Sequence, residues 1–448
     1  MSDERNTLGR RLKRYADVTT KVGGAAARMA GARMLGREPD QKSEASDLKA
    51  ALGNLKGPLM KVAQMLATVP DVIPADFAAE LGTLQTQAPA MGWPFVRRRM
   101  AAELGPTWEQ RFKTFERDAA AAASLGQVHR ATDKSGRKLA CKLQYPDMAS
   151  AVEADLAQLR LLFAVYRRMD RAIDPSEISE EVGARLREEL DYKREAAHIA
   201  LYRAMLKDIK TIHVPEVVTD LSTGRLLTMS WEEGKPILDF KTRPLADRNK
   251  IALSLFKAWW HPFSHFGAIH GDPHLGNYTI REDLELNLLD FGCIRTFKPK
   301  FVGGVIDLYH ALEHNKPDLA VHAYETWGFA GLKKEVIEAL NIWARFIYSP
   351  LLDNKVRTIA NGIEPSAYGR KEAAEVHKRL SQLGPVKPPR EFVFMDRAAI
   401  GLGAVFLHLQ AEMNFYKLFN EEIESFSLGT VAKRQKTAFE AAGVPLAA

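Results

Sequence analysis

The amino-acid sequence predicts an α+β fold of two lobes, with a helical N-terminal extension and a mostly helical C-terminal lobe. Short β-prone runs separated by turn residues gather between Phe112 and Trp231, whereas apolar residues recur at helical spacing before and after them. The 448 residues are 46% hydrophobic and 27% charged, which suits a large buried core and more than one domain. We expect four segments: a basic amphipathic segment (1–37), a helical extension (38–110), a strand-containing lobe with a helical insert (111–233) and a helical lobe (234–448).

The first segment accounts for most of the net positive charge of the chain. Residues 1–37 contain nine Lys or Arg and three Asp or Glu, a net charge of +6, while the whole chain carries +7. Apolar residues repeat at helical spacing beside this charge: Leu8, Leu12, Tyr15, Val22 and Met29. The pattern is typical of a helix on an anionic membrane surface, and a solvated helix packed on the protein body remains open. Asp3 and Glu4 disfavour a transit peptide, and the lack of interleaved aromatic residues disfavours nucleic acid.

Neither a membrane-spanning helix nor a disulfide framework is expected. The longest run without a polar residue, Ala398 to Leu407, covers ten residues, and a bilayer-spanning helix needs about 20. Cys141 and Cys293 are the two cysteines, and no CxxC pair exists. A reducing compartment is therefore favoured.

The extension and the strand-containing lobe follow in order. Residues 44–105 read as helices, broken at Gly57 and Pro58 and again near Pro74. Next, Gln127 to Ala131 and Leu139 to Leu143 flank a turn-like segment and predict a hairpin.

Helices and two further β-prone runs complete this lobe. One helix is expected from about Met148 to Met169, and a second begins at Asp174 and runs past Tyr202. The runs Ile212 to Val218 and Arg225 to Trp231 then lead into Glu232, Glu233 and Gly234, a plausible hinge.

The helical lobe carries the strongest chemical signal. His270, Asp272 and Asn277 form the pattern HxDxxxxN, and Asp290 opens the triplet DFG after a strand-like run. This order and spacing is that of a kinase-type catalytic loop. Phosphoryl transfer needs oxygen ligands for Mg²⁺, and Asn277 with Asp290 supply a carbonyl and a carboxylate. Asp272 would then face the attacking hydroxyl or water.

Upstream residues complete the nucleotide-binding pattern. A glycine-loop counterpart, with alanine at the first two glycine positions, consists of Ala121, Ala122, Ala123, Ser124, Gly126 and Val128. Lys142 ends the run Leu-Ala-Cys-Lys, which is similar to the strand whose lysine pairs with the α- and β-phosphates. Alanine carries a cost of about 1 kcal/mol where glycine would take a positive φ, so we expect a differently shaped loop over ATP.

A kinase lysine needs a helical glutamate partner. Glu195 is our choice for Lys142, because Asp191 and Glu195 lie four apart on one helix face while Glu189 points elsewhere. For each of these carboxylates the alternative without a functional role is a solvent-exposed acidic helix face. Protein kinases place a long segment ending in A-P-E after DFG, but here Pro299 begins a helical pattern seven residues after Gly292. A peptide-docking platform of that type is not expected.

Other reactive side chains have simpler interpretations. His261 and His265 have the i, i+4 spacing that could suit zinc, but no HExxH glutamate accompanies them, so a zinc site is disfavoured. Cys141 and Cys293 adjoin the inferred nucleotide-site motifs, and core packing is the favoured interpretation.

Together these motifs resemble the UbiB (AarF-type, coenzyme Q-associated) atypical protein-kinase-like family over nearly the whole chain. Lys61-Val-Ala-Gln64 resembles the Lys-x-Gly-Gln signature of the family, and Glu189-Leu-Asp191 resembles its Glu-x-Asp signature. The resemblance implies a kinase-like fold in which the extension covers the active site through Lys61, Gln64, Glu189 and Asp191. Ala63 stands where the signature has glycine, which bears on how closely that helix approaches the nucleotide.

The resemblance also implies an activity. It points to an atypical kinase or ATPase that uses ATP and Mg²⁺ and supports ubiquinone (coenzyme Q) biosynthesis. Its partners would be anionic membrane lipids and coenzyme Q enzymes or lipid intermediates, from a peripheral position on the inner membrane facing the cytoplasm or organelle matrix. A small-molecule phosphotransferase of the aminoglycoside or choline kinase type, whose catalytic loop is similar, stays open, as does a nucleotide-sensing scaffold without turnover.

Overall fold

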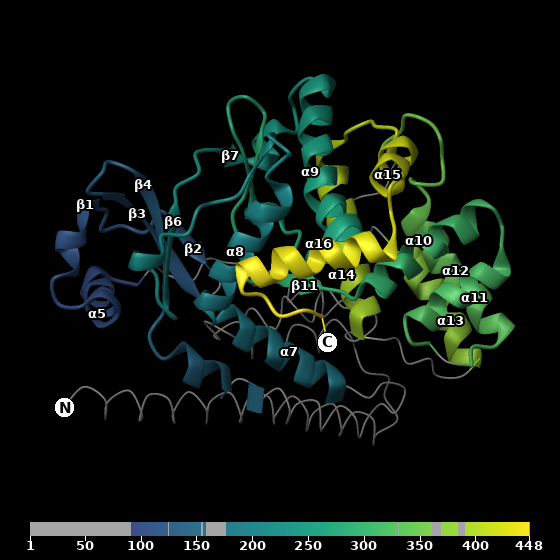
Figure 1. Cartoon of the computed structure of the whole chain (residues 1–448), viewed down its shortest axis with the longest axis horizontal. Helices are drawn as coiled ribbons and strands as arrows, with labels where there is room; N and C mark the ends of the chain where they lie inside the picture. The colour runs from purple at the N-terminus through teal and green to yellow at the C-terminus, as the bar shows by residue number, and fades with distance from the viewer. Residues whose placement is uncertain are drawn as a thin grey trace, which may run out of the picture. The chain divides into compact units, whose positions relative to one another are not determined.

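The fold is mixed helix and sheet, which confirms the α+β prediction (Figure 1). The computed structural model describes residues 91–123, 125–153, 156–157, 176–329, 331–360, 369–383 and 390–447. The basic segment 1–37 and most of the predicted extension lie outside these residues. By its internal contacts the chain divides into two units. The first comprises Met1–Pro106, Glu116–His129 and Lys142–Leu190, and the second comprises Thr107–Phe115, Arg130–Cys141 and Asp191–Ala448.

Three sheets are present in the described part of the chain. A five-stranded sheet has the order β1-β3-β4-β6, with β2 paired to β3. A four-stranded sheet has the order β5-β10-β9-β7, and a two-stranded sheet joins β11 to β8. The strands are β1 (Phe112–Phe115), β2 (Ala121–Ala123), β3 (Gly126–Asp133), β4 (Lys138–Gln144), β5 (Ile212–His213), β6 (Leu226–Ser230), β7 (Lys235–Pro236), β8 (Ala268–His270), β9 (Tyr278–Ile280), β10 (Leu286–Leu288) and β11 (Ile294–Thr296).

The other regular elements are helices. The α-helices are α5 (Trp93–Leu104), α7 (Ser176–Glu189), α8 (Tyr192–Leu206), α9 (Leu245–Phe266), α10 (Pro299–Glu313), α11 (Pro317–Thr326), α12 (Lys334–Tyr348), α13 (Arg370–Leu383), α14 (Arg390–Leu409), α15 (Phe415–Ile423) and α16 (Leu428–Ala442). Short 3-10 helices are η1 (Trp108–Arg111), η2 (Thr219–Leu221), η3 (Ile237–Phe240) and η4 (Leu275–Asn277). None of the helices in the described ranges is long and apolar enough to cross a membrane.

The predicted hairpin is present as β3 and β4. Its turn is organised by Asp133, whose Oδ1 accepts hydrogen bonds from the backbone N–H groups of Ser135 and Arg137, both at 2.9 Å. The hydroxyl of Ser135 first, and then these backbone bonds and the Arg137 side chain, lower the pKa of Asp133 to about 2. A short polar side chain that bonds its own backbone is the physical reason why this turn could be predicted.

Helix α9 forms the centre of the second unit. Its Trp260 ring lies 4.7 Å from the ring of Phe419 on α15, and its Phe263 ring lies 5.9 Å from Phe297. In Figure 1, α16 runs across α9, and the two helices are in contact. Edge-to-face aromatic pairs of this kind stabilise a core by about 0.5–1.5 kcal/mol each beyond their buried area. The core of this unit is therefore organised around one long helix.

Apolar residues at helical spacing have two different outcomes in the helical lobe. Phe301, Val305, Leu308 and Leu312 lie buried on α10. The same spacing runs from Leu402 on α14 to Met413 and Tyr416, but α14 ends at Leu409 and Gln410 takes a left-handed φ of 47°. Met413 instead pairs with Arg357 in an isolated β-bridge.

Candidate functional site

The predicted catalytic loop begins where α9 ends. Gly267 closes the helix with φ 64°, donating its N–H to the carbonyl oxygen of Phe263. A Cβ at this position would lie 2.6 Å from the carbonyl oxygen of Phe297, so no larger residue fits without displacing backbone. The chain then enters β8 (Ala268–His270), which delivers His270 to the start of the loop.

Strands β8 and β11 join the catalytic loop to the DFG segment. They pair antiparallel, with Ile294 opposite His270, and the N–H of Gly271 donates to the carbonyl oxygen of Cys293 at 2.7 Å. His270 is buried, and its Nε2 donates to the main-chain oxygen of Asp290 at 2.5 Å. Its Nδ1 accepts from the N–H of Asp272 at 3.4 Å, so the proton donated to Asp290 lies on Nε2. The imidazole of His270 therefore links the catalytic loop to the DFG segment by hydrogen bonds.

Asn277 and Asp272 are also linked. The amide Nδ2 of Asn277 donates to the main-chain oxygen of Asp272 at 2.8 Å. This bond assigns the side-chain nitrogen, and the carbonyl oxygen Oδ1 is then the atom that can coordinate a cation. The negative charge of Asp272 also acts on Tyr278: burial first, and Asp272 second, raise the pKa of its phenol well above the ordinary value.

The donor set of this region fits Mg²⁺. Asp290 accepts the N–H of Gly292 through Oδ1 at 3.0 Å, which fixes the carboxylate within the DFG turn. A carboxylate offers about four lone-pair positions, so this bond uses only part of its capacity. Amide and carboxylate oxygens are the hard ligands that Mg²⁺ takes from proteins. Asn277 and Asp290 are therefore chemically suited to the role predicted for them.

Helix α8 holds the DFG phenylalanine. The carboxylate of Glu195, only 2% exposed, accepts the N–H of Phe291 at 3.5 Å. One turn later, Nδ1 of His198 donates to the carbonyl oxygen of Phe291 at 3.0 Å. The ring of Tyr202, one further turn along, lies 5.4 Å from the ring of Phe291 in an edge contact. Positions 195, 198 and 202 share one helix face, so α8 binds Phe291 through both backbone groups and its ring.

The prediction of one continuous helix past Tyr202 is wrong. Helix α7 ends at Glu189, and α8 begins at Tyr192, with Asp191 as its N-cap. Oδ1 of Asp191 accepts the N–H groups of Lys193 and Arg194, both at 3.1 Å. The argument from a shared face of Asp191 and Glu195 therefore does not hold, because Asp191 lies outside the helix that carries Glu195.

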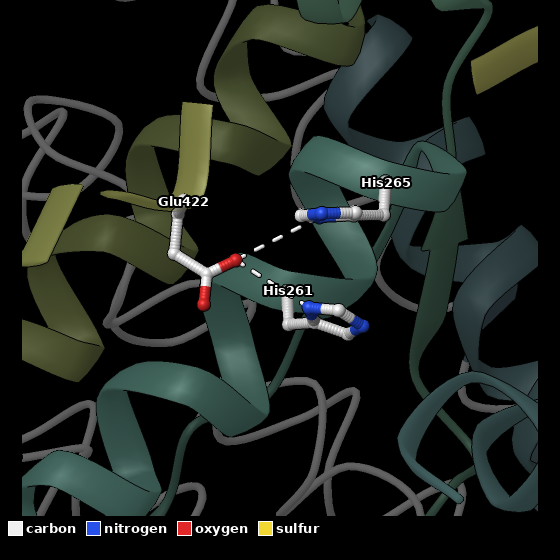
Figure 2. A group of neighbouring side chains, drawn as sticks. All are labelled: His261, His265 and Glu422. Atoms are coloured by element: carbon white, nitrogen blue, oxygen red, sulfur yellow. Dashed lines mark ion pairs between the residues drawn. The ribbon is translucent and has the colours of Figure 1, made fainter. Parts of the chain in front are cut away.

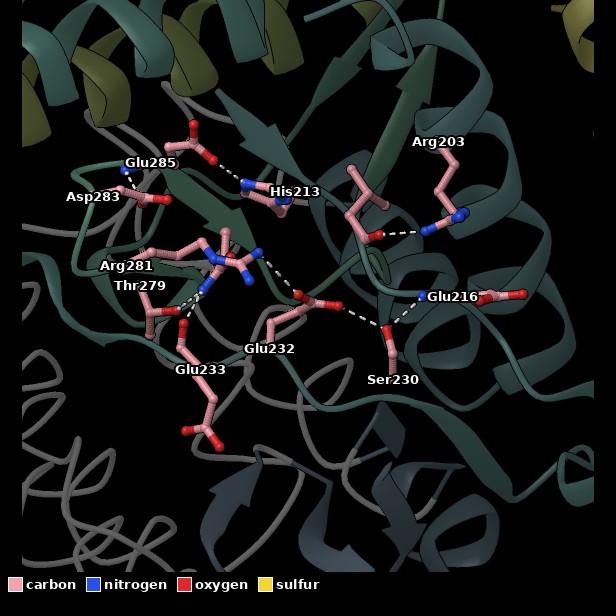
Figure 3. A network of polar contacts seen from close by, with 12 residues as sticks. Arg203, His213, Glu216, Ser230, Glu232, Glu233, Thr279, Arg281, Asp283 and Glu285 are labelled. Atoms are coloured by element: carbon pink, nitrogen blue, oxygen red, sulfur yellow. Dashed lines mark hydrogen bonds and ion pairs between the residues drawn. The ribbon is translucent and has the colours of Figure 1, made fainter. Parts of the chain in front are cut away.

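The predicted hinge connects two sheets. Residues 231–234 lead from β6 to β7, and Figure 3 shows how they are held. The carboxylate of Glu232 accepts from Ser230 Oγ at 2.7 Å and from the guanidinium of Arg281 at 3.5 Å. Asn287 of β10 donates to the main-chain oxygen of Glu233 at 2.9 Å.

A close approach fixes the end of this segment. A Cβ on Gly234 would lie 2.7 Å from Oγ1 of Thr279. The segment is thus anchored on the four-stranded sheet beside the catalytic loop.

The alanine-rich loop and Lys142 lie in the first unit. Ala121 pairs with Val128 and Ala123 with Gly126, so the alanines form an extended strand, β2, with Ala121 and Ala122 exposed. None of them takes a positive φ. The side chain of Lys142 is largely buried on β4. Ser124 lies outside the described residues.

A buried glutamine anchors the described part of the extension in this unit. Gln127 is fully buried, and its amide exchanges hydrogen bonds with the backbone of Met91, accepting the N–H at 2.5 Å and donating to the oxygen at 3.2 Å. The guanidinium of Arg99 on α5 donates to the carbonyl oxygen of Tyr145 at 3.2 Å. These contacts join residues 91–104 to β3 and to the residue that follows β4.

The structure brings Asp272, Asn277, Asp290 and Glu195 into one connected set within the second unit. Glu189 lies half-buried at the end of α7 in the first unit. Lys142 also belongs to the first unit, so its proposed pair with Glu195 of the second unit stays a prediction. Lys61 and Gln64 lie outside the described residues. His198 belongs to no recognisable motif in the sequence, and its spacing of three residues from Glu195 is the one signal that indicates it.

Comparison with known proteins supplies the family. The sequence model of the ABC1 atypical kinase-like domain matches residues 83–321, more than half of the chain. The chain belongs to the ABC1 atypical kinase-like family. The resemblance inferred from the motifs is thereby confirmed.

Relatives in this ABC1 family come from distant organisms. Atypical kinase coq-8, mitochondrial, of Caenorhabditis elegans is 26% identical over 87% of this chain and 52% of its own length. Protein ACTIVITY OF BC1 COMPLEX KINASE 7, chloroplastic, of Arabidopsis thaliana is 32% identical over 85% of this chain and 55% of its own. The chain spans about half the length of the curated relatives it matches. Among solved structures, Rv3197 of Mycobacterium tuberculosis in complex with erythromycin is 26% identical, with a TM-score of 0.59 over 89% of this chain and 98% of that one.

Proposed function

We propose that this protein is a Mg²⁺-dependent, ATP-binding atypical kinase or ATPase that supports ubiquinone biosynthesis. The observation that carries the proposal is the connected set around Phe291, in which Glu195 and His198 hold the DFG backbone and His270 bonds Asp290. Kinases require a helix, a catalytic loop and a DFG segment in defined register. Membership of the ABC1 family and the likeness to coq-8 support the link to coenzyme Q.

In this proposal each residue has one role. Asp272 orients the attacking hydroxyl or water, and Asn277 and Asp290 hold the metal. When bound, Mg²⁺ neutralises charge that develops on the phosphates. Lys142, paired with Glu195, binds the α- and β-phosphates. The strand formed by Ala121, Ala122 and Ala123, with Ser124, Gly126 and Val128, covers the nucleotide.

The proposal extends to the parts of the chain outside the described residues. Lys61 and Gln64, with Glu189 and Asp191, cover the active site, in place of a peptide-docking platform. The basic segment 1–37 attaches the protein to anionic lipid, which would place the active site near coenzyme Q intermediates or their enzymes. The position proposed is peripheral, on the inner membrane.

Release of phosphate from Mg-ATP tests the proposal. We would compare the full-length protein with Asp290→Asn, with and without anionic liposomes. Asp208→Asn is the matched control, because Asp208 is an exposed aspartate in the same unit, just beyond α8. We expect Asp290→Asn to lose Mg²⁺-dependent turnover and Asp208→Asn to keep it. Equal turnover in both variants would contradict the proposed role of Asp290 as a Mg²⁺ ligand.

The two alternatives give different outcomes in the same assay. A nucleotide-sensing scaffold would bind ATP, in a manner sensitive to Asp290→Asn, without phosphate release above the level of that variant. A small-molecule phosphotransferase would release little phosphate alone but transfer it to an added hydroxyl compound. A screen of aminoglycosides and choline, with labelled ATP, separates this case from hydrolysis.

A further inference from the structure

A cluster of two histidines and a glutamate lies away from the catalytic loop, at the end of α9. His261 and His265 stand one turn apart on α9, and Glu422 reaches them from α15. Figure 2 shows the carboxylate of Glu422 directed at both imidazoles. Its Oε2 lies 3.4 Å from Nδ1 of His261 and 3.7 Å from Nδ1 of His265. All three residues belong to the second unit.

These side chains present ligand atoms to one point. One potential ligand atom from each residue lies within 4.8 Å of the others. The two imidazole rings stack, with centroids 4.2 Å apart and an angle of 27° between planes. A tetrahedral zinc ion with bonds of about 2.0–2.1 Å requires ligand atoms about 3.3–3.4 Å apart. The two distances to Glu422 are already close to that value.

Glu422 Oε2 supplies an independent observation. This oxygen is buried and accepts no hydrogen bond, although the two imidazole nitrogens lie at ion-pair distance from it. Burial of a carboxylate oxygen without a partner costs free energy, so such an atom calls for an explanation. A bound cation between the carboxylate and the two rings provides one.

The hydrogen bonds around His265 leave its Nδ1 able to bind a metal. Ser264 Oγ lies 2.8 Å from both Nδ1 of His265 and the carbonyl oxygen of Trp260, so its hydroxyl can donate to Trp260 when Nδ1 binds a metal.

We propose that His261, His265 and Glu422 form a binding site for a divalent transition-metal ion of the zinc class. His₂Glu is a known ligand set for zinc, with water in the fourth position. The ion would join the last turns of α9 to α15. Because α9 ends at Gly267 and leads into β8, the site would stabilise the base of the catalytic loop without touching it.

A second cluster serves as an internal control. His310, Glu313 and His314 also bring ligand atoms within 4.8 Å of one another, at the end of α10. His310 and His314 have side chains 38% and 53% exposed, against 24% and 17% for His261 and His265. Glu313 there also contacts the hydroxyl of Tyr309 at 3.4 Å. This more solvated group is expected to bind metal weakly.

Metal titration of the full-length protein tests the site. After treatment with a chelator, Zn²⁺ affinity is measured by competition with a chromophoric chelator, and Co²⁺ is added to record the visible d–d spectrum. We expect one tight equivalent and a tetrahedral Co²⁺ band. Glu422→Gln, which keeps the shape of the side chain, and His261→Gln are each expected to weaken Zn²⁺ binding by more than the roughly 10- to 100-fold that loss of an outer-shell partner causes. His314→Gln leaves it unchanged.

Each outcome bears on the proposal. The absence of a tight equivalent in wild-type protein, or equal Zn²⁺ affinity in wild-type and folded Glu422→Gln protein, would overturn it. Circular dichroism confirms folding of each variant, and if Glu422→Gln fails to fold, His261→Gln decides. An octahedral Co²⁺ spectrum that responds to His314→Gln would assign binding to the other cluster and also overturn it. None of these readouts depends on ATP turnover.

Discussion

The imidazole of His198 donates a hydrogen bond from Nδ1 to the carbonyl oxygen of Phe291, 3.0 Å away. Both groups are buried, and Phe291 has no exposed surface. A buried carbonyl oxygen that loses its donor destabilises the fold by about 1–3 kcal/mol, which is more than the intact hydrogen bond contributes to stability. Together with Glu195 it fixes the backbone of the residue that directly follows Asp290. The position of the proposed metal ligand is therefore linked to α8.

We predict that His198→Ala lowers ATP turnover and destabilises the fold by about 1–3 kcal/mol, because the oxygen of Phe291 loses its donor in a buried site. His198→Asn, which retains an N–H donor at a similar reach, is expected to recover part of both losses. Urea unfolding gives the stability, and phosphate release gives the activity. Wild-type turnover in folded His198→Ala protein would contradict the link between α8 and Asp290.

The break between α7 and α8 shows where sequence analysis reached its limit. The periodic pattern from Asp174 past Tyr202 suggested one helix, because apolar residues continue on both sides of Leu190. Aspartate is a preferred N-cap, but one continuous helix would place Asp191 in its interior. Here its side chain bonds two backbone N–H groups at the start of α8. Periodicity alone cannot locate such a cap, since the residues on each side still fit a helix.

Asp191→Ala is predicted to destabilise the protein by about 1 kcal/mol through loss of the cap, whereas Asp191→Asn retains a capping oxygen and costs less. Thermal and urea unfolding measure the difference. The proposed role of Asp191 in covering the active site predicts a separate loss of turnover in Asp191→Asn. If activity follows stability alone in both variants, the residue is only a cap.

The proposed zinc site could not be predicted in full from the sequence. His261 and His265 were recognisable as a helical pair, but the proposed third ligand, Glu422, lies 157 residues beyond His265 in the sequence. No spacing rule connects residues so far apart, and only the packing of α15 on α9 brings them together. By contrast, the catalytic loop and DFG could be read directly, because eight consecutive residues and one triplet carry their pattern.

Ala121→Gly tests the meaning of the alanine strand. Glycine loses more conformational freedom than alanine in a strand, so we expect β2 to weaken by about 0.5–1 kcal/mol. The loosened segment is predicted to change the affinity for ATP or ADP, or to permit autophosphorylation. Equilibrium nucleotide titrations and incorporation of labelled phosphate are the measurements. Identical titrations without incorporation would show that alanine at this position has no influence on the nucleotide.

Cys141 is predicted to be inert in the native protein. Burial raises the pKa of its thiol to about 12, and Thr228 Oγ1 donates to its sulfur at 3.8 Å. The thiolate is the reactive form, so it is scarce at pH 8. A thiol reagent should therefore label the half-buried Cys293 first and Cys141 only after unfolding. The Cys293→Ser variant isolates the signal: rapid labelling of this variant under native conditions would contradict the burial of Cys141.

The basic segment yields a prediction with a defined salt dependence. Each Lys or Arg near an anionic surface contributes about 1 kcal/mol to membrane binding, and added salt screens this attraction. Replacement of Arg10, Arg11, Lys13 and Arg14 by Gln is therefore expected to weaken binding to anionic vesicles by up to about 4 kcal/mol, with little effect on neutral vesicles. Deletion of residues 1–37 is expected to remove the salt-dependent part altogether.

Co-sedimentation with vesicles at increasing NaCl concentrations measures both effects. If the truncated protein sediments with anionic vesicles as well as the full chain does, the membrane contact must come from another part of the molecule. Turnover of Mg-ATP in the same samples then separates two cases. Retained hydrolysis with lost binding would make the segment an anchor, whereas loss of both would mean that the membrane contact controls the active site.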